Sequence, residues 1–395
     1  MRFFQSPKDP VKPLPFRVYS LVVVCLAICG LIASLYLSIS HYRVYTDIGY
    51  RSFCAITRAI NCDTVSQSPY AIFLNVPVPV WGIWGYLLLL LMLSVAHARQ
   101  TVKNRIWAIA FLISMAFSLY SCILAYISSY YIQAYCIVCI ATYAVNFLLA
   151  YFTWLIRKRF DSHNLIKALK GDFQYITQTR QQILVLGSIF VAISIALIAF
   201  FPDYWDLGLS HHSNQLPTGV TEDGHPYIGA DSPQIVITEY SDYLCFQCKK
   251  MNFYLREFIV QYQDKIKLVH RHFPMDSRFN PIVKAPFHEG AGIMSLVAIH
   301  AAENGKFWPV NDYFFSVAGH GARIDLKELS AKLGLNVHKI EKALNDPNLR
   351  QKLRQDIQQG LKLGLTGTPS YVIEGRVYHS MIPAEVFNKL LNAER

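Results

Sequence analysis

The segment Tyr135-Cys136-Ile137-Val138-Cys139-Ile140 lies inside a long apolar run, and this run sets the architecture of the first half of the chain. The run extends from Ile106 to Ile156 without a single Asp, Glu, Lys or Arg. One helical membrane crossing takes roughly 20 residues, so the run is about twice too long for one helix. It therefore predicts two crossings that turn near Ser128–Tyr135, where tyrosines form an aromatic belt. These tyrosines are Tyr126, Tyr130, Tyr131 and Tyr135.

Three further apolar segments each have about the length of one crossing. They are Val18–Ser40, Val76–Ala96 and Ile183–Phe201, and none of them contains Asp, Glu, Lys or Arg. The first is longer than the core of a usual signal peptide and has no small-x-small site before His41, which argues against cleavage. The sequence thus predicts five crossings.

The basic residues predict the orientation of these crossings. Residues 1–202 hold 16 Lys+Arg against 5 Asp+Glu, whereas residues 203–395 hold 21 of each, so the formal excess of +11 lies in the first part. With a cytoplasmic N-terminus, most of these basic residues face the cytoplasm, as the positive-inside rule requires. They are Arg2, Lys8, Lys12, Arg17, Arg99, Lys103, Arg105, Arg157, Lys158, Arg159, Lys167, Lys170 and Arg180, and only Arg43, Arg51 and Arg58 face out. Residues 203–395 are then outside. Because the excess charge flanks apolar segments, it does not indicate nucleic-acid binding.

Six of the nine cysteines share the outer side in this topology. They are the pairs Cys54/Cys62 in the loop 41–75, Cys136/Cys139 at the outer end of the fourth helix, and Cys245/Cys248 in the outer region. Disulfides persist in oxidising compartments, and thiolate attack on a disulfide passes an electron pair from one dithiol to the next. The placement predicts a relay of dithiols. Cys25, Cys29 and Cys122 lie within apolar helices, where a cysteine behaves as a small hydrophobe, and we interpret them as structural.

The outer region reads as a thioredoxin-like domain. Gln234–Tyr240 predicts a buried strand, Cys245-Phe246-Gln247-Cys248 follows a short turn, and Cys248–Gln263 has helical spacing. Orphan N–H groups at the start of that helix favour a thiolate on the first cysteine. Lys265–Phe273 predicts a second strand and residues 284–361 predict helices. Pro369 is placed as the cis-proline of a thioredoxin fold, although a trans turn is the alternative.

This region resembles the DsbA-like branch of the thioredoxin superfamily. The residues that carry the resemblance are Glu239-Tyr240-Ser241-Asp242-Tyr243-Leu244-Cys245-Phe246-Gln247-Cys248-Lys249-Lys250 and the Thr368-Pro369 step. The resemblance implies that Cys245 is the exposed nucleophile, Cys248 the buried resolving cysteine, and Glu239 a buried carboxylate that accepts a proton. Glu239 as an ordinary charge at a strand edge is the alternative. Phe246 and Gln247 depart from the family, so its oxidising strength is not carried over.

Residues 18–156 resemble the vitamin K epoxide reductase family. The eight-residue separation of Cys54 and Cys62, the segment Asn61-Cys62-Asp63 with Ser68, the helix Cys136–Asn146 and Val78-Pro79-Val80-Trp81-Gly82 carry this resemblance. The order of the two halves is similar to the bacterial fusion members. We therefore expect a four-helix membrane domain at 1–160, a cytoplasmic loop, fifth helix and linker at 161–224, and a periplasmic DsbA-like domain at 225–395.

The second resemblance implies a quinone as electron acceptor, ubiquinone or menaquinone, in an apolar pocket. We assign Tyr143, Ser68, Trp81 and Asn146 to that pocket, with Tyr143 or Ser68 donating to a carbonyl. Trp84 and Tyr86 are interpreted as interfacial packing. Val78 stands where the family often has a polar residue, so one hydrogen bond to the quinone is absent or comes from elsewhere. The histidines show no metal spacing, His270 and His272 are interpreted as structural, and no metal is expected.

Together these expectations predict an all-α membrane bundle of four helices, a fifth linking helix, and an α/β thioredoxin-like domain with a helical insertion. We expect an oxidoreductase of the bacterial inner membrane that forms disulfide bonds. Electrons from secreted protein thiols would pass through Cys245/Cys248, Cys54/Cys62 and Cys136/Cys139 to the membrane quinone pool. Two alternatives stay open: a membrane-coupled disulfide isomerase or reductase, and a non-enzymatic assembly factor with structural cysteines.

Overall fold

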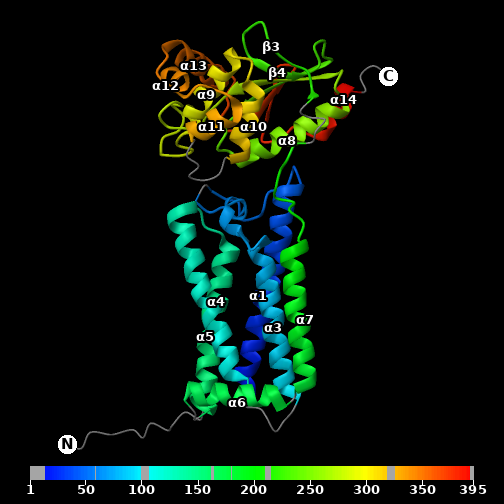
Figure 1. Cartoon of the computed structure of the whole chain (residues 1–395), viewed down its shortest axis with the longest axis vertical. Helices are drawn as coiled ribbons and strands as arrows, with labels where there is room; N and C mark the ends of the chain where they lie inside the picture. The colour runs from blue at the N-terminus through cyan, green and yellow to red at the C-terminus, as the bar shows by residue number, and fades with distance from the viewer. Residues whose placement is uncertain are drawn as a thin grey trace, which may run out of the picture. The chain divides into compact units, whose positions relative to one another are not determined.

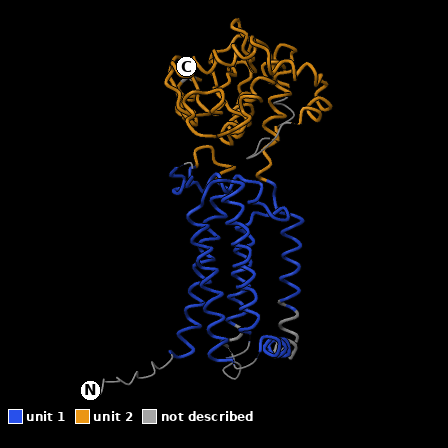
Figure 2. Tube along the Cα trace, turned by 90° about the vertical axis from the view of Figure 1, so that its left-hand side faces the viewer, with its two compact units in different colours: residues 1–43, 51–203 blue, residues 44–50, 204–395 orange. Residues whose placement is uncertain are grey.

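The computed structural model describes residues 14–57, 59–98, 106–161, 164–178, 180–209, 215–317 and 325–391. The chain divides into two compact units, which are described separately (Figure 2). Met1–Arg43 and Arg51–Asp203 form the first unit, and Val44–Tyr50 and Tyr204–Arg395 form the second. Some of the basic residues used for the predicted orientation lie outside the described residues. These are Arg2, Lys8, Lys12, Arg58, Arg99, Lys103 and Arg105.

Long helices build the first unit (Figure 1). α1 (Phe16–Thr46), α4 (Trp107–Ile127) with the π-helical turn Ser128–Ile132, and α5 (Ile137–Phe160) are long and apolar enough to cross a membrane. α3 (Val78–Ala98) and α7 (Arg180–Phe200) carry shorter apolar stretches, Val78–Ser94 and Gly187–Phe200. The two helices predicted between Ile106 and Ile156, and the turn between them, are confirmed. The total of five crossings stays a prediction.

The start of α4 is held by a residue from another helix. Ile106 precedes α4 without a side-chain cap of its own. Asp172, in α6 (Leu165–Gln178), is 2% exposed, and its Oδ2 accepts hydrogen bonds from the backbone N of Ala108 at 3.0 Å and of Ile109 at 3.4 Å. The carboxylate satisfies two of the N–H groups that a helix leaves unpaired at its start.

Short elements connect α1 to α3. They are α2 (Cys62–Ser66), a 3-10 turn (Pro69–Ala71), and the paired strands β1 (Ile72–Phe73) and β2 (Val76–Pro77). Trp81, in the first turn of α3, donates from Nε1 to the carbonyl of Phe73 at 2.9 Å. This bond ties the small hairpin to the helix that follows it.

A six-stranded sheet forms the centre of the second unit, in the order β3-β4-β6-β5-β7-β8. The strands are β3 (Thr218–Val220), β4 (Pro226–Gly229), β5 (Ile235–Ser241), β6 (Ile266–His272), β7 (Ser370–Ile373) and β8 (Arg376–His379). β5 runs parallel to β6 and antiparallel to β7. Both predicted strands, Gln234–Tyr240 and Lys265–Phe273, are confirmed as β5 and β6. β-branched and apolar residues fill them, as is typical of buried strands.

Helices cover this sheet. α8 (Phe246–Gln261) follows β5 directly, and α14 (Ala384–Leu391) is the last described helix. The predicted helical insertion is confirmed between β6 and β7. It contains α9 (Ala291–Glu303), α10 (Phe307–Val317), α11 (Leu326–Leu333), α12 (Val337–Ala343) and α13 (Pro347–Lys362). The peptide bond Thr368–Pro369 is cis, as predicted.

Candidate functional site

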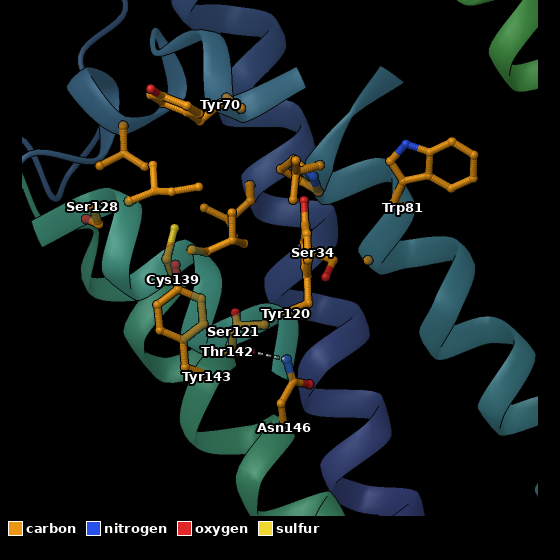
Figure 3. Close-up of a pocket in the computed structure, with 18 of the residues that line it drawn as sticks. Ser34, Tyr70, Trp81, Tyr120, Ser121, Ser128, Cys139, Thr142, Tyr143 and Asn146 are labelled. Atoms are coloured by element: carbon orange, nitrogen blue, oxygen red, sulfur yellow. Dashed lines mark hydrogen bonds between the residues drawn. The ribbon is translucent and has the colours of Figure 1, made fainter. Parts of the chain in front are cut away.

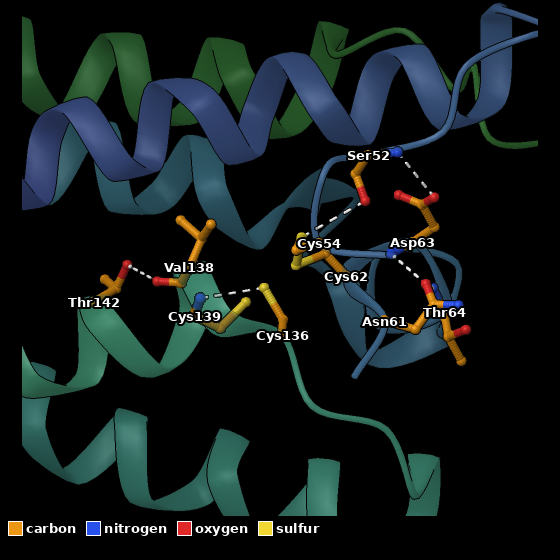
Figure 4. The surroundings of a disulfide bond; sticks show 10 residues. All are labelled: Ser52, Cys54, Asn61, Cys62, Asp63, Thr64, Cys136, Val138, Cys139 and Thr142. Carbon is orange, nitrogen blue, oxygen red and sulfur yellow. Dashed lines mark hydrogen bonds between the residues drawn. A yellow bond between two sulfur atoms is a disulfide. The ribbon is translucent and has the colours of Figure 1, made fainter. Parts of the chain in front are cut away.

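Cys54 and Cys62 form a disulfide in the loop after α1, with their Cα atoms 5.7 Å apart. Both are buried. Asn61 caps α2 by accepting hydrogen bonds from two backbone N–H groups, at 3.0 and 3.1 Å, and thereby fixes the helix that begins at Cys62. The carboxylate of Asp63 accepts from the backbone N of Ser52 at 3.1 Å and so joins the two arms of the loop (Figure 4).

A backbone bridge holds this loop against the start of α5. Ile60 pairs in parallel with Tyr135. The backbone N of Tyr135 donates to the carbonyl of Ala59 at 2.7 Å, and the backbone N of Asn61 donates to the carbonyl of Tyr135 at 2.9 Å. Asn61 and Tyr135 immediately precede Cys62 and Cys136. The bridge therefore brings the two cysteines into one buried cluster that also contains Cys54 and Leu37.

Cys136 and Cys139 are free thiols at the first turn of α5. Cys136 caps the helix, and its Sγ accepts from the backbone N of Cys139 at 3.1 Å (Figure 4). The Cys139 thiol, donating to Cys136, lowers the pKa of Cys136, and helix N–H groups add to this effect against the opposing effect of burial. A low pKa favours the thiolate, which is the form that attacks or leaves in disulfide exchange.

A cavity of about 280 Å³ opens beside Cys139, and its walls are mainly apolar. All four residues that the sequence assigned to a quinone, Tyr143, Ser68, Trp81 and Asn146, line it together with Cys139. Figure 3 labels Tyr143, Trp81, Asn146 and Cys139 among them. Val78 lines it too, so the site lacks a polar side chain at that position. The volume lies just below the lower end of the range for small-molecule pockets, about 300 Å³.

Asn146 has a fixed orientation in this cavity. Its Oδ1 accepts from the Tyr86 hydroxyl at 2.5 Å, and its Nδ2 donates to Ser121 Oγ at 2.9 Å. An amide nitrogen carries two N–H groups, so one remains for a ligand. Ser118 Oγ, at 3.0 Å from the carbonyl of Asn146, binds the backbone of the same residue. Tyr86 and Ser121 thus fix the side-chain amide, and Ser118 fixes the backbone from which it extends.

The polar side chains of the cavity differ in whether they have a hydrogen-bond donor left for a ligand. Ser68 donates its hydroxyl hydrogen to the carbonyl of Val65 at 2.8 Å, and Trp81 uses its N–H for Phe73. The Tyr143 hydroxyl has no hydrogen-bond partner within the described part of the chain. Tyr143 is therefore better suited than Ser68 to donate to a bound carbonyl.

The sequence interpretation missed several residues of the cavity. Tyr86 was interpreted as interfacial packing, but it is 2% exposed and orients Asn146. Trp84 does pack, since its ring stacks on Phe190 with centroids 4.6 Å apart. No spacing rule separates two aromatic residues so close on one helix. Other lining residues that were missed are Ser34, His41, Tyr70, Tyr120, Ser121 and Thr142.

In the second unit, Cys245 and Cys248 are free thiols at the start of α8. Cys245 Sγ accepts from the backbone N of Cys248 at 3.3 Å and donates to the carbonyl of Thr368 at 3.4 Å, beside the cis-proline. Hydrogen bonding from the Cys248 thiol lowers the pKa of Cys245, whereas burial raises the pKa of Cys248 well above its ordinary value. These directions suit Cys245 as nucleophile. Cys245 is only 9% exposed, which differs from the exposed cysteine that the resemblance implied.

His288 is a further residue that the sequence did not reveal. Its Nδ1 lies 3.0 Å from Asp242 Oδ2, and Asp242 Oδ1 accepts from the backbone N of Leu244 at 2.7 Å, in the turn before Cys245. The charge of His288 lowers the pKa of Cys245. An imidazole thus acts on the nucleophile although Phe246 and Gln247 occupy the positions between the cysteines. His288 lies 43 residues after Cys245 in sequence, and no local pattern announces it.

Glu239 forms a buried pair with a histidine. Its Oε1 lies 2.7 Å from His270 Nδ1, and both residues are 1% exposed. Tyr371 faces Glu239 in the β5–β7 register, and its buried hydroxyl has no hydrogen-bond partner among the residues the structure describes. Burial raises the pKa of Tyr371 well above its ordinary value, and the charges of Glu239, Cys248 and Cys245 add to this. Proton transfer by Glu239 stays a prediction, since its carboxylate bonds to His270.

Other candidate residues lie apart from these sites. Cys25, Cys29 and Cys122 are exposed on α1 and α4 and are not paired in disulfides. Within the described ranges, no group of three or more His, Cys, Asp or Glu side chains is arranged to hold a metal ion.

Comparison with known proteins gives each half a family. Residues 21–154 match the profile of the Vitamin K epoxide reductase family, and residues 236–392 match that of the DSBA-like thioredoxin domain. Vitamin K epoxide reductase complex subunit 1 of Mus musculus is 31% identical over 142 residues, which cover 33% of this chain and 86% of that protein.

Two further similarities are partial. A Na(+)/H(+) antiporter NhaA of Herminiimonas arsenicoxydans is 25% identical over 167 residues, or 42% of this chain, and the chain spans only 25% of its length. The solved structure of Pseudomonas aeruginosa DsbA2 is 22% identical, covers 42% of this chain and 94% of its own, and has a TM-score of 0.34.

The linking helix α7 lies between the two matches, so that a helical domain with seven of the nine cysteines precedes a thioredoxin-like domain with two. The chain belongs to the vitamin K epoxide reductase family and carries a DsbA-like thioredoxin domain at its C-terminal end.

Proposed function

We propose that this protein is a thiol:quinone oxidoreductase that forms disulfide bonds in secreted proteins. The observation that carries the proposal is the placement of the cysteines in the first unit. The Cys54–Cys62 disulfide shares a buried cluster with Cys136, and Cys139 lines the wall of an apolar cavity. A chain of exchangeable sulfurs that ends at an apolar cavity is the arrangement that dithiol-to-quinone transfer needs.

The transfer begins in the thioredoxin-like unit. A reduced client dithiol exchanges with a Cys245–Cys248 disulfide, which oxidises the client and leaves two thiols on the protein. The Cys245 thiolate then attacks the sulfur of Cys54, and Cys62 leaves as a thiolate. Cys248 attacks Cys245 in the resulting mixed disulfide, releases Cys54, and restores the Cys245–Cys248 disulfide. The net result is two electrons and two protons moved to Cys54 and Cys62.

The second exchange takes place within the buried cluster. The Cys62 thiolate attacks a Cys136–Cys139 disulfide at Cys136, and Cys139 leaves as a thiolate next to the cavity. Cys54 attacks Cys62 and releases Cys136, which re-forms the loop disulfide. The lowered pKa of Cys136 makes it a good leaving group in that last step. Cys136 and Cys139 then hold the electron pair.

The residues of the cavity fit a quinone. Its apolar walls suit a flat ring, and the free N–H of Asn146 and the hydroxyl of Tyr143 are donors that suit carbonyl oxygens. A bound quinone supplies an acceptor for two electrons and two protons. Cys139 would be the thiol nearest to such an acceptor, and Asn146 and Tyr143 would hold it and stabilise negative charge on its oxygens.

Purified full-length protein tests this function with a reduced client protein and a short-chain quinone analogue, followed by the change in quinone absorbance. Cys139→Ser is expected to stop quinone reduction with every thiol donor. Cys245→Ser is expected to stop it with the client protein but not with dithiothreitol, which reaches Cys54–Cys62 directly. Unchanged quinone reduction by Cys139→Ser would refute the proposal.

We also propose that the protein lies in the bacterial inner membrane, with the thioredoxin-like unit on the outer side. Three membrane-length helices and the distribution of Lys and Arg support this orientation. Alkaline phosphatase fused after Arg395 is expected to be active, because its disulfides form only in an oxidising compartment. An inactive but intact fusion would contradict the orientation.

A further inference from the structure

The segment Val44–Tyr50 belongs to the second unit, although the residues on both sides of it belong to the first (Figure 2). The chain therefore passes between the units three times, after Arg43, after Tyr50 and after Asp203. Without the docked segment, only the passage after Asp203 would join them. The contacts that hold Val44–Tyr50 therefore decide whether the chain joins the two units at one place or at three.

One stripe of α8 binds the backbone of this segment. Phe246, Lys250 and Tyr254 are spaced by four residues and lie on one face of the helix. Lys250 Nζ donates to the carbonyls of Val44 at 2.9 Å and Asp47 at 2.8 Å. The Tyr254 hydroxyl lies within hydrogen-bond distance of two more carbonyls, those of Tyr45 at 3.0 Å and Thr46 at 3.1 Å.

Three of these carbonyls, those of Val44, Tyr45 and Thr46, belong to the last turn of α1, where the helix itself supplies no N–H groups to them, and Asp47 directly follows the helix. A cation is favoured at this end, because the helix dipole places partial negative charge there. Lys250 is 1% exposed. Burial of an ammonium group is costly unless its N–H groups are bonded, so its place is explained by the carbonyls that it binds.

Side chains of the segment complete the contact. The Tyr45 ring meets the Phe246 ring edge-on, with centroids 5.1 Å apart. Ile48 packs against the main apolar core of the second unit. The segment is therefore held by backbone hydrogen bonds, an aromatic pair and core packing, all next to the nucleophile, since Phe246 directly follows Cys245.

Because Cys54 is joined covalently to the docked segment, the docking limits how far Cys54 can lie from that segment. Cys54 follows Tyr50 by four residues. Four residues span at most roughly 14 Å, so Cys54 stays within that distance of the docked segment however the units are arranged. A short tether between two reacting groups raises their effective concentration, and this effect falls as the tether grows longer.

We propose that Phe246, Lys250 and Tyr254 form a clamp on Val44–Tyr50 that keeps Cys54 within exchange distance of Cys245. Lys250 and Tyr254 are positioning residues, because they bind backbone carbonyls of the segment and act through the length of the tether. This inference rests on the proposed transfer from Cys245 to Cys54. It adds that the transfer depends on the docking of a segment which precedes Cys54 in sequence.

The effective concentration of the two sulfurs can be measured directly. In full-length Cys62→Ser/Cys248→Ala protein, Cys54 and Cys245 can form a disulfide as oxidised glutathione is reduced to two glutathione molecules. The fraction with this crosslink, assigned by mass spectrometry across a series of glutathione ratios, gives the effective concentration. Lys250→Met with Tyr254→Phe is expected to lower it by roughly tenfold or more, because the short tether is released.

Matched controls separate the clamp from general damage to α8. Lys249→Met and Tyr262→Phe remove the same groups from the same helix and its end, outside the contacts with Val44–Tyr50, and are expected to leave the effective concentration within twofold. The alkylation rate of Cys245 is expected to stay within twofold in every variant, which reports an intact nucleophile. An equal crosslink yield in the clamp variant and the controls would overturn the proposal.

A second variant works without touching α8. Eight Gly/Ser residues inserted between Tyr50 and Arg51 lengthen the tether from four to twelve residues and are expected to lower the effective concentration about fivefold, by the −3/2 power of length. In the Lys250→Met/Tyr254→Phe background the insertion is expected to have no further effect. An insertion effect of the same size in both backgrounds would overturn the clamp. Absence of any Cys54–Cys245 crosslink in the parent protein would instead overturn the proposed function.

Discussion

Replacing Tyr86 by phenylalanine removes one hydroxyl from the wall of the cavity and leaves the ring in place. The lost hydrogen bond, 2.5 Å from Tyr86 to Asn146 Oδ1, is the bond that fixes the oxygen side of the amide. Asn146 is 8% exposed, so its oxygen is left buried without a donor. A buried acceptor without a partner costs about 1–3 kcal/mol.

That cost is expected to appear in stability and in ligand binding. In a unit of this size each kcal/mol lowers the Tm by roughly 2–4 °C. The freed amide also loses its preferred orientation toward the cavity, which weakens ligand binding. A loss of about 1.4 kcal/mol in binding free energy corresponds to about tenfold in affinity. We expect the KM for a quinone analogue to rise about tenfold, with kcat within twofold, because Asn146 holds the bound ligand and does not exchange sulfurs.

Dithiothreitol-driven quinone reduction and a thermal unfolding scan of the purified protein measure both effects. Tyr120→Phe is the matched control, since Tyr120 lines the same cavity without bonding to Asn146. If Tyr86→Phe leaves KM and Tm as they are in the parent protein, or if Tyr120→Phe produces the same changes, the assignment of Asn146 as an oriented donor is wrong.

Three further predictions concern charges. His288→Asn removes a charge that lowers the pKa of Cys245, so the pH profile of Cys245 alkylation is expected to move to higher pH; an unmoved profile would contradict this. Burial raises the pKa of Asp356 to about 6, so the folded state binds more protons than the unfolded state between pH 4 and 6 and stability falls as pH rises through that window. Asp356→Asn is expected to unfold at higher urea concentration than the parent protein at pH 7.5, by on the order of 2–3 kcal/mol, and this advantage should vanish at pH 4. Asp172→Ala leaves two N–H groups at the start of α4 without their acceptor. It is expected to lower the free energy of unfolding by about 1–2 kcal/mol, measured as a lower Tm, and Asp172→Asn is expected to lower it less.

The sequence was most informative where local chemistry determines structure. The charge-free run at Ile106–Ile156 is too long for one helix, and the structure contains two. A strand, two cysteines and a helix in succession predicted the arrangement around Cys245, because each element depends on its neighbours in sequence. The cis bond at Pro369 followed from the same pattern.

What escaped prediction depends on contacts between distant residues. His270 was interpreted as structural because a strand pattern shows burial but not which acid lies on the neighbouring strand, here Glu239. Tyr86 and Trp84 cannot be told apart by their sequence pattern. Only the arrangement of the helices shows that Tyr86 donates a hydrogen bond to Asn146, whereas Trp84 stacks on Phe190. Lys250 binds carbonyl oxygens, and every residue has a carbonyl oxygen, so no sequence pattern could identify its partners.

The bridge between Ile60 and Tyr135 has a consequence for sequence variation in this loop. It aligns Cys62 with Cys136 entirely through main-chain atoms, so the side chains at positions 59, 60 and 135 are not needed for the alignment. These positions are free to diversify, for example to suit another lipid or client, while the sulfurs keep their places. Proline is the exception at 135, because it lacks the N–H that this position donates to the carbonyl of Ala59. Position 61 is restricted further, because the Asn61 side chain also caps α2. Saturation mutagenesis of the loop should therefore return broad tolerance at Ala59 and Ile60, and a single forbidden residue at Tyr135.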